Sequence, residues 1–442
     1  MVAEENGRII GYLWLQTCAA PASVAQSGCR STRIYIRSLY VSPDRKGIGV
    51  GSALMNLAVE HARSSGFAEI WLGVMKPNRR AYDWYMERGF FVRGEEAFPM
   101  GGTTVSCLIC SKTLSGRFVA VYDDSSALSL NELCRCLFSQ QVANWRPLRD
   151  AVGKRRLIET KTFREKGLLL RVQWNPGRMA SSTADVERAV DRRSCFLCRR
   201  RLSRSQKAIQ YRKDFLILCN PAPIALPHFT VAARAHIPQA FFPAAEDYLL
   251  LCRDFGPRWN VLYNGPRCGA SAPDHLHFQV IPSGVLPLSA GVGITAIGSD
   301  RGVSVSVFRR LGFGAIVLKG RQASPLAGIL GRLQAVLPSA AGDASDGEPM
   351  FNVLGRYDGK FWQLMIYPRR RHRPKDFHRL DEKRLVISPG VFEMGGLAVT
   401  PDENTFRCID KFRLLRVLRE VACPPGRVAN IAGRLLLKGG GH

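Results

Sequence analysis

The chain has 442 residues, of which 46% are hydrophobic and 22% charged, so it is a folded globular protein with room for two or three domains rather than a disordered one. The formal net charge is +27, and most of the excess lies after residue 113, where 50 Lys and Arg stand against 27 Asp and Glu. An excess of basic residues on the surface suits a phosphate-rich substrate, although these residues are equally compatible with a basic face that only contacts water. No helix-turn-helix, zinc-finger or aromatic RNA-binding motif is present, so we do not expect a nucleic-acid partner.

The start of the chain lacks a basic region followed by an apolar run, and no apolar stretch reaches about 18 residues. These features predict a cytoplasmic protein without a membrane segment. The 13 cysteines are scattered along a long chain, which favours reduced thiols and a metal site over a disulfide framework.

A strand, a glycine-rich turn and a helix follow one another near the N-terminus. Residues 34–41 alternate as in a strand, residues 42–51 read SPDRKGIGVG, and apolar residues from Leu54 onward recur at helical spacing up to Gly66. A helix N-terminus behind such a turn presents backbone N–H groups and the positive end of a dipole. The segment therefore predicts a pyrophosphate-binding turn.

This segment resembles the GNAT acetyltransferase family, whose loop is matched by Lys46-Gly-Ile-Gly-Val-Gly51 and whose downstream motif is matched by Asn78…Ala81…Tyr85…Gly89-Phe90. The resemblance implies acetyl-CoA as cofactor and Tyr85 as the general acid that protonates the leaving thiolate. The alternative for Tyr85 is a core aromatic beside Trp84. The cofactor-binding residues implied by the resemblance are Val41, Lys46, Gly47, Gly49, Gly51 and Asn78.

The resemblance covers residues 1–112, and the chain begins where the family's second strand is expected. We therefore expect an N-terminally incomplete domain, either because the start is placed too late or because the domain is a remnant. The resemblance implies CoA binding more directly than acetyl transfer, for which no general base can be assigned.

The chemistry of the second part centres on His275-Leu-His277-Phe-Gln279, which follows a Gly/Ser-rich loop. Read with a period of two, His275, His277 and Gln279 share one face of a strand, and the apolar residues between them share the other. Packing alone does not explain two imidazoles and an amide in this arrangement. The stretch therefore predicts a catalytic strand.

The stretch resembles the histidine-triad (HIT-like) superfamily, in particular its galactose-1-phosphate uridylyltransferase and dinucleoside-tetraphosphate phosphorylase branch. That resemblance implies an α+β fold with two pseudo-repeated halves and one site per chain, in which His277 attacks the α-phosphate and forms a nucleotidyl-histidine. Gln279 stands where the hydrolase branch has its third histidine. Because an amide can hold a phosphate but cannot shuttle a proton, transfer or phosphorolysis is favoured over hydrolysis.

A zinc site is predicted beside this strand. Cys195 and Cys198 have the spacing of a zinc knuckle, and His236 and His275 are the residues that would complete a Cys2His2 set. A similar pattern occurs in the uridylyltransferases. His228 is a competing ligand, although its surroundings favour the start of a strand, and a free cysteine pair is the structural alternative.

Other polar residues are assigned to the substrate, which the resemblance implies is a nucleoside diphosphate sugar or a nucleoside polyphosphate. They are Asn175 and Arg178 after a strand, Asn264, Gly269 and Ser271 before the catalytic strand, and Arg369 and Arg373 in an arginine-rich loop, where solvated arginines are the alternative. The predicted organisation is an incomplete α/β GNAT-like domain with a mixed sheet (1–112), a linker (113–129), an α+β HIT-like domain (130–423) and a peripheral tail (424–442).

Three interpretations of the whole chain remain. The preferred one is a bifunctional enzyme that carries out nucleotidyl transfer or phosphorolysis, with an N-terminal N-acetyltransferase-like domain. In the second, acetyl transfer is the main activity and the HIT-like part recruits the substrate. In the third, the chain is a non-enzymatic nucleotide-binding or nucleic-acid-binding module. A homodimer is possible in each, because HIT-like domains often dimerise.

Overall fold

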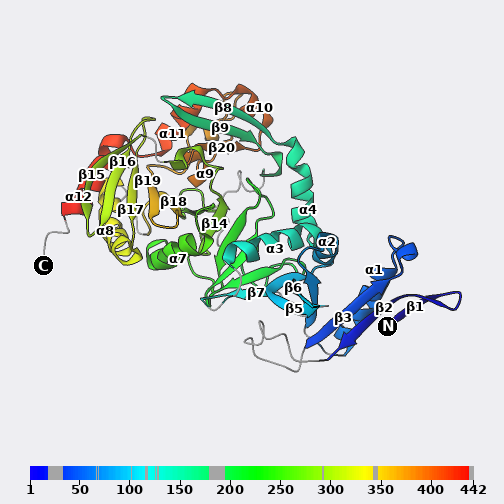
Figure 1. Cartoon of the computed structure of the whole chain (residues 1–442). Helices are drawn as coiled ribbons and strands as arrows, with labels where there is room; N and C mark the ends of the chain where they lie inside the picture. Colours follow the sequence, from blue (N-terminus) through cyan, green and yellow to red (C-terminus); the bar gives the residue numbers. More distant parts are fainter. Residues whose placement is uncertain are drawn as a thin grey trace. The chain divides into compact units, whose positions relative to one another are not determined.

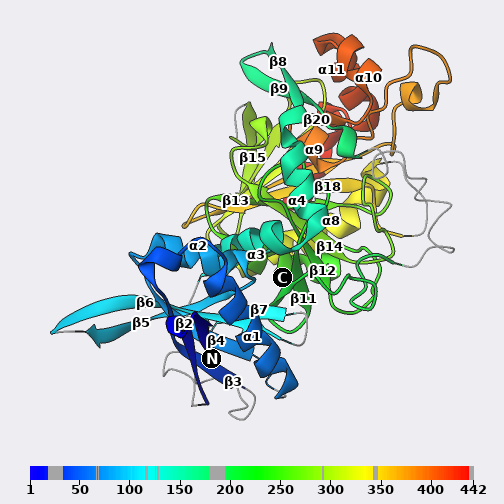
Figure 2. The ribbon, with the colours of Figure 1, turned by 90° about the vertical axis from the view of Figure 1, so that its right-hand side faces the viewer.

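The structure is a computed structural model of the chain, and it describes all residues except 18–32, 66, 68, 101, 115–117, 125, 127–128, 179–194, 291–292, 342–346 and 438–442 (Figures 1 and 2). Contacts divide it into two compact units. The first comprises residues 1–149 and 203–213, and the second comprises residues 150–202 and 214–442. The predicted linker over 113–129 lies partly outside the described residues.

The first unit contains a six-stranded sheet in the order β1-β2-β3-β4-β6-β5. All its neighbours pair antiparallel except β3 and β4, which are parallel and are connected through helix α1. The apolar side of α1 packs with strand residues such as Leu13, Ile34 and Leu72 in one core. The elements are β1 Val2–Glu5, β2 Arg8–Gln16, β3 Arg33–Val41, α1 Val50–Ser64, β4 Glu69–Met75, α2 Arg79–Glu87, β5 Phe91–Met100 and β6 Thr103–Thr113.

Further elements join this unit. Helix α3 (Leu130–Asn144) begins with a capping box formed by Ser129 and Glu132, and it contacts α2 and β5. Strands β7 (Phe118–Tyr122) and β10 (Ala208–Tyr211) form a parallel pair. Helix α4 (Arg146–Gly153) crosses the division between the two units, which falls after residue 149. This grouping of contacts differs from the predicted domain limits at residues 112 and 130, which stay a prediction.

The second unit is built on a large sheet whose strands run in the order β15-β16-β17-β19-β18-β13-β14-β12-β11. Helix α7 (Ala245–Phe255) packs against β13 and β18, and α8 (Ala323–Ala341) packs against β17 and β19. The chain is thus mixed α/β, with a smaller N-terminal sheet followed by a large sheet domain. The strands are β11 Phe215–Cys219, β12 Phe229–Ala233, β13 Trp259–Asn264, β14 His277–Pro282, β15 Ile294–Asp300, β16 Val303–Phe308, β17 Ala315–Gly320, β18 Phe351–Tyr357 and β19 Trp362–Pro368.

The connectivity of this sheet repeats. A strand pair, a helix and a second strand pair occur as β11-β12-α7-β13-β14 and again as β16-β17-α8-β18-β19. In space the two sets read β11-β12-β14-β13 and β16-β17-β19-β18, and they meet where β13 pairs antiparallel with β18. The two sets therefore have the same strand order on either side of this central pair.

A smaller layer covers part of the large sheet. Strands β8 (Glu159–Glu165), β9 (Leu168–Trp174) and β20 (Leu397–Thr400) form a three-stranded sheet. Its apolar residues share one core cluster with residues of the large sheet such as Leu262 and Ile281. Helices α9 (Val391–Met394) and α10 (Glu403–Cys408) contact β20, and buried residues of α11 (Lys411–Val421) belong to the same core cluster.

The C-terminal segment is not peripheral as predicted. Helix α12 (Pro425–Leu437) packs against α8 and strands β15–β17, and it buries Val428, Ile431 and Leu435. Its apolar positions recur at helical spacing, which accounts for this packing. Among the described helices, none combines the length and the hydropathy that a bilayer span requires.

Candidate functional site

In the first unit, the parallel strands β3 and β4 pair only over Arg33–Ile36 and Glu69–Leu72. Beyond this point β3 continues to Val41 along β2, and β4 continues along β6. The turn after Val41 contains Gly47 and Gly49, whose positive φ angles of 89° and 99° are accessible to glycine. Gly49 is the N-cap of α1 and provides no side-chain cap, so the first backbone N–H groups of this helix point out of its N-terminus beside the end of β3. Lys46 in this turn is exposed.

Two predicted residues lie on helix α2. Asn78 is its N-cap, and its side-chain oxygen accepts a hydrogen bond from the Ala81 N–H at 3.1 Å. The Tyr85 ring packs edge-on against Trp84 and Phe90, which is the packing of a core aromatic. Burial raises the pKa of Tyr85 to about 12.

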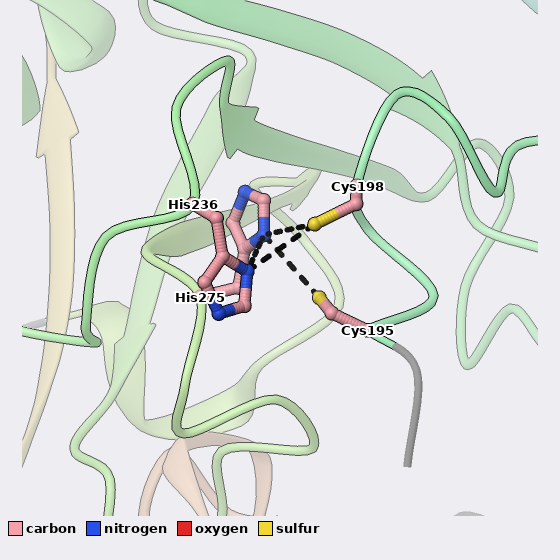
Figure 3. A group of neighbouring side chains, drawn as sticks. All are labelled: Cys195, Cys198, His236 and His275. Atoms are coloured by element: carbon pink, nitrogen blue, oxygen red, sulfur yellow. Dashed lines mark hydrogen bonds between the residues drawn. The ribbon is translucent and has the colours of Figure 1, made fainter.

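In the second unit, the structure brings together the four residues predicted to bind a metal, Cys195, Cys198, His236 and His275 (Figure 3). The two histidine Nδ1 atoms are 3.3 Å apart, and three sulfur–nitrogen distances measure 3.2, 3.3 and 3.7 Å. A tetrahedral zinc ion would place such nitrogens about 3.3 Å apart and sulfur and nitrogen about 3.5 Å apart. The geometry of this Cys2His2 cluster therefore fits zinc.

Hydrogen bonding prepares His275 as a ligand. Its Nε2 lies 2.7 Å from the Ala233 carbonyl, to which it donates, so the lone pair is on Nδ1, which faces the cluster. The Nε2 atom of His236 lies 3.8 Å from the Asp274 carboxylate on the side away from the cluster. His228, the competing ligand, is not a member of the cluster.

His277 is the first residue of β14, so the strand begins two residues later than expected. The Gln239 side chain accepts from the His277 N–H at 2.8 Å and donates to its carbonyl at 3.1 Å, which fixes the backbone. The His277 Nδ1 lies 2.9 Å from the His275 carbonyl. Because a carbonyl only accepts, this contact places the imidazole proton on Nδ1 and the lone pair on Nε2.

Gln279 shares the face of β14 with His277, because alternate residues of a strand point to the same side. Its Oε1 lies 2.9 Å from Nε2 of His228, which is 1% exposed. The two partners are 51 residues apart in the sequence, and the sequence pattern gave no signal for this contact.

One cavity of the second unit collects most of the residues predicted to bind substrate. Arg178, Asn264, Gly269, Ser271, Gln279 and Arg373 all line it. Sequence reasoning missed His372, Ser388, Phe392 and Glu393, which also line it. The first flanks the predicted Arg373. The other three belong to the stretch Ser388–Glu393, which resembles HIT-like proteins but has only two polar residues to indicate a site.

The pKa values of the buried titratable groups that line this cavity are shifted. Burial raises the pKa of Glu393, whose two oxygens accept the N–H groups of Gly390 and Val399. Burial, together with Arg373, lowers the pKa of His372 to about 4. Arg178 donates to the Ala222 carbonyl at 2.6 Å. The cavity combines two guanidinium groups and the Gln279 amide, a set suited to a phosphate, with the Glu393 carboxyl, which interacts with Arg178.

Two predicted substrate ligands do not line the cavity. Arg369 is 1% exposed, and its guanidinium donates to the Asn352 side chain and to the carbonyls of Pro389, Val421, Arg371 and His372. The donors of Arg369 tie together four chain segments, which favours a structural role, and its assignment to the substrate stays a prediction. Asn175 is 6% exposed and donates at 3.4 Å to Gln173 and to the Pro223 carbonyl, so it supports the turn that carries Arg178.

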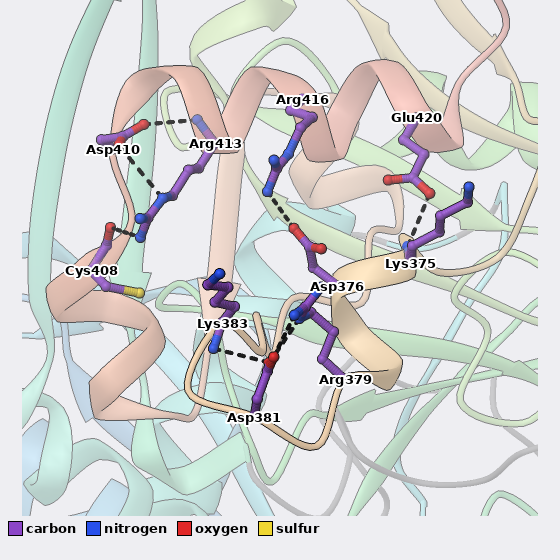
Figure 4. Close-up of polar contacts among 10 residues, drawn as sticks. All are labelled: Lys375, Asp376, Arg379, Asp381, Lys383, Cys408, Asp410, Arg413, Arg416 and Glu420. Carbon is purple, nitrogen blue, oxygen red and sulfur yellow. Dashed lines mark hydrogen bonds and ion pairs between the residues drawn. The ribbon is translucent and has the colours of Figure 1, made fainter.

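A second cavity has basic walls but a different charge arrangement. Among its lining residues are Arg379, Lys383, Arg413 and Arg416 (Figure 4). The three arginines face carboxylates: Arg416 pairs with Asp376, Arg379 with Asp381 and Arg413 with Asp410. The three arginine side chains are 40–62% exposed, so water also screens these pairs. The first cavity is the better candidate for a phosphate.

Two family models match separate parts of the chain. Residues 1–90 match the model of the acetyltransferase (GNAT) family. The N-terminal part is a GNAT acetyltransferase domain. Residues 137–282 match a domain of unknown function, DUF4922, and this match includes the Cys2His2 cluster, His277 and Gln279. The GNAT domain therefore precedes a domain to which the family description assigns no activity.

The individual relatives described next are both acetyltransferases and align over about a quarter of the chain. An uncharacterized N-acetyltransferase of Mycobacterium tuberculosis is 31% identical over 101 residues, which cover 23% of this chain and 58% of the relative. The mycothiol acetyltransferase of Acidothermus cellulolyticus is 30% identical over 109 residues, which cover 23% of this chain and 33% of that protein. This chain thus spans less than two thirds of the curated relatives.

Solved structures of acetyltransferases also align. A ribosomal-protein-alanine N-acetyltransferase from Brucella melitensis has 21% identity and a TM-score of 0.22, with 25% of this chain and 66% of that chain covered. A putative acetyltransferase from Salmonella typhimurium, solved with its cofactor acetyl-CoA, has 22% identity and a TM-score of 0.23, with coverages of 28% and 67%.

Proposed function

We propose that the GNAT domain binds acetyl-CoA and transfers the acetyl group to an amine. The main support is the turn Lys46–Gly51, which presents the N-terminus of α1 beside the end of β3 where β3 and β4 have separated. Such a helix N-terminus suits the pyrophosphate of CoA. The Tyr85 hydroxyl would give its proton to the leaving thiolate. The comparisons favour acetyl transfer over nucleotidyl transfer as the main activity.

The test is acetyl-CoA binding by calorimetry, followed by release of free CoA thiol with a panel of amines. Binding with thiol release that depends on an amine would support the proposal. A chain that folds but binds no acetyl-CoA would contradict it. The Lys46→Ala variant checks whether binding uses this turn, and Lys76→Ala, in which an exposed lysine of the same unit is changed, is the matched control.

We further propose that the second unit transfers a nucleotidyl group through His277. The observation that best supports this proposal is the position of His277, whose lone pair is on Nε2. His277 shares a strand face with Gln279, which lines a cavity together with Arg178 and Arg373. The repeated strand order on either side of β13 and β18 supports the interpretation as a HIT-like fold with two pseudo-repeated halves. The predicted substrates are nucleoside diphosphate sugars and nucleoside polyphosphates.

In the proposed reaction, Nε2 of His277 attacks the α-phosphorus. A P–N bond forms and the bond to the leaving phosphate oxygen breaks, so the leaving group departs as an anion. The imidazole gains positive charge, which the His275 carbonyl stabilises through the Nδ1 hydrogen bond. An oxygen of phosphate or of a sugar phosphate then attacks the phosphorus, and the P–N bond returns its electron pair to Nε2.

The Cys2His2 cluster would hold zinc in a structural role. Zinc bound by Cys195, Cys198, His236 and His275 would fix the loop that leads into β14. The His275 carbonyl, which accepts from His277, belongs to one of these ligands. The cluster would therefore orient the proposed nucleophile through the backbone.

Intact-protein mass spectrometry with a panel of nucleoside diphosphate sugars and nucleoside polyphosphates tests this second activity. We expect an acid-labile adduct of one nucleoside monophosphate that is absent from His277→Ala and present in the control His378→Ala, in which an exposed histidine is changed. No adduct and no turnover with the whole panel would contradict nucleotidyl transfer. Acetyl transfer that survives in His277→Ala would favour the alternative in which the second unit only recruits the substrate.

A further inference from the structure

We propose that His228 is a positioning residue that fixes the Gln279 amide with its N–H donors toward the cavity, where they hold the oxygens of a phosphoryl group. This inference rests on the part of the proposed function that places a phosphate in this cavity. It concerns a residue that belongs neither to the Cys2His2 cluster nor to the lining of the cavity.

The direction of the hydrogen bonds follows from the surroundings of the His228 ring. The backbone N–H of Ile224 donates to Nδ1 of His228 at 3.3 Å. An imidazole that accepts at Nδ1 carries its proton on Nε2, so Nε2 donates to its partner at 2.9 Å, which must be the carbonyl oxygen of Gln279. The NH2 end of the amide is consequently turned away from His228, and Gln279 lines the cavity.

The ring is also held in place and kept neutral. It is 1% exposed and packs edge-on against Phe392, whose side chain lines the cavity. Burial and the nearby positive charge of Arg178 lower the pKa of His228 to about 3. Both ring nitrogens are engaged, and the ring remains neutral throughout the physiological pH range.

The consequence concerns what Gln279 can recognise. A glutamine amide presents either an acceptor or a donor depending on which way it is turned. With Oε1 tied to His228, the amide offers donors, which suit the anionic oxygens of a phosphoryl group. An amide that was free to rotate would also occupy orientations that turn its oxygen toward the same anion, and these would weaken binding.

A double-mutant cycle measures this coupling. The probes are UMP, GMP and AMP, and their binding to the full chain is followed by 31P NMR titration. We expect Gln279→Ala to weaken binding about tenfold to a hundredfold, as for a hydrogen bond to a charged group. His228→Phe should cause a similar loss, and the double variant should be no weaker than either single variant. Gln363→Ala, an amide of the same sheet that does not line the cavity, should bind as the parent does.

His228→Gln tests rescue, because a glutamine amide can donate to Oε1 in place of the imidazole Nε2. We expect it to recover most of the affinity that His228→Phe loses. Additive losses in the cycle, or parent-like binding by His228→Phe, would overturn the inference. The same conclusion would follow if the parent chain bound none of the three nucleotides.

A measurement on the parent chain does not depend on how well the variants fold. The 15N chemical shifts of the His228 ring distinguish the Nε2–H tautomer from the Nδ1–H tautomer and from the imidazolium. We expect a neutral Nε2–H ring between pH 5 and 8, and either other form would overturn the inference. Coupled nucleotide binding without any adduct at His277 would retain the inference and reject nucleotidyl transfer.

Discussion

Arg369 and Arg373 lie four positions apart in one arginine-rich loop, and the structure assigns them opposite roles. Arg369 is 1% exposed and donates five hydrogen bonds to protein oxygens. Arg373 lines the cavity, donates to Ser388 at 3.0 Å and stacks on Phe377. We predict that Arg369→Met destabilises the second unit and that Arg373→Met mainly weakens the binding of phosphate-bearing ligands.

The magnitude follows from the partners that lose a donor. Replacing Arg369 removes the guanidinium from the Asn352 amide oxygen and from four backbone carbonyls, of which the Val421 carbonyl still accepts from the Arg370 N–H. Each buried acceptor left unsatisfied costs about 1–3 kcal/mol, but removing the buried charge recovers part of this cost. We therefore expect a loss of about 3–5 kcal/mol in the free energy of unfolding. Arg373→Met should cost less, because the side chain that contacts Ser388 and the Phe377 ring is only partly buried at the cavity wall.

The assay must report on the second unit by itself, because the chain contains two compact units. Hydrogen–deuterium exchange along a urea series, read on peptides that cover residues 350–425, provides this. Nucleotide binding to both variants is measured in parallel by 31P NMR.

The opposite pattern would refute the reasoning. If Arg369→Met lost less than about 1 kcal/mol of stability and also lost nucleotide binding, Arg369 would be a substrate ligand as the sequence suggested. If both variants were equally destabilised and bound nucleotide equally well, the roles that we assign to both arginines would be wrong.

Three further predictions address other parts of the chain. Native mass spectrometry should find one zinc per chain, and His236→Ala should weaken zinc binding more than about tenfold; a zinc-free parent chain that folds normally would contradict the site. Tyr85→Phe should lower the rate of acetyl transfer about 100-fold with little change in acetyl-CoA affinity, whereas an unchanged rate would make Tyr85 a core aromatic only. Burial raises the pKa of Glu348 to about 7, so the folded state binds a proton that the unfolded state has released between about pH 4.5 and 7. Stability should therefore fall by about 3 kcal/mol as the pH rises through this window, and Glu348→Gln should flatten the urea-denaturation profile over the same window.

The local sequence pattern was sufficient to predict several features of the candidate sites. The spacing of Cys195 and Cys198, together with two histidines, identified the residues that the fold brings into one cluster. The period of two along β14 placed His277 and Gln279 on one face, because side-chain direction in a strand follows from the backbone alone. The glycine-rich turn before α1, together with the downstream Asn78…Ala81…Tyr85…Gly89-Phe90 segment, indicated the GNAT domain, and the positive φ angles of Gly47 and Gly49 account for the glycines of the turn.

Other features depend on contacts between distant segments. The contact between His228 and Gln279 spans 51 residues and exists only because β12 and β14 are neighbours in the sheet. Glu393 and His372 reach the cavity through the packing of loops that have no periodicity to read. In the same way, Arg369 and Arg373 cannot be distinguished in the sequence. Outside regular elements, the direction of a side chain is decided by which distant carbonyls, carboxylates and rings surround it, and only the tertiary structure supplies these partners.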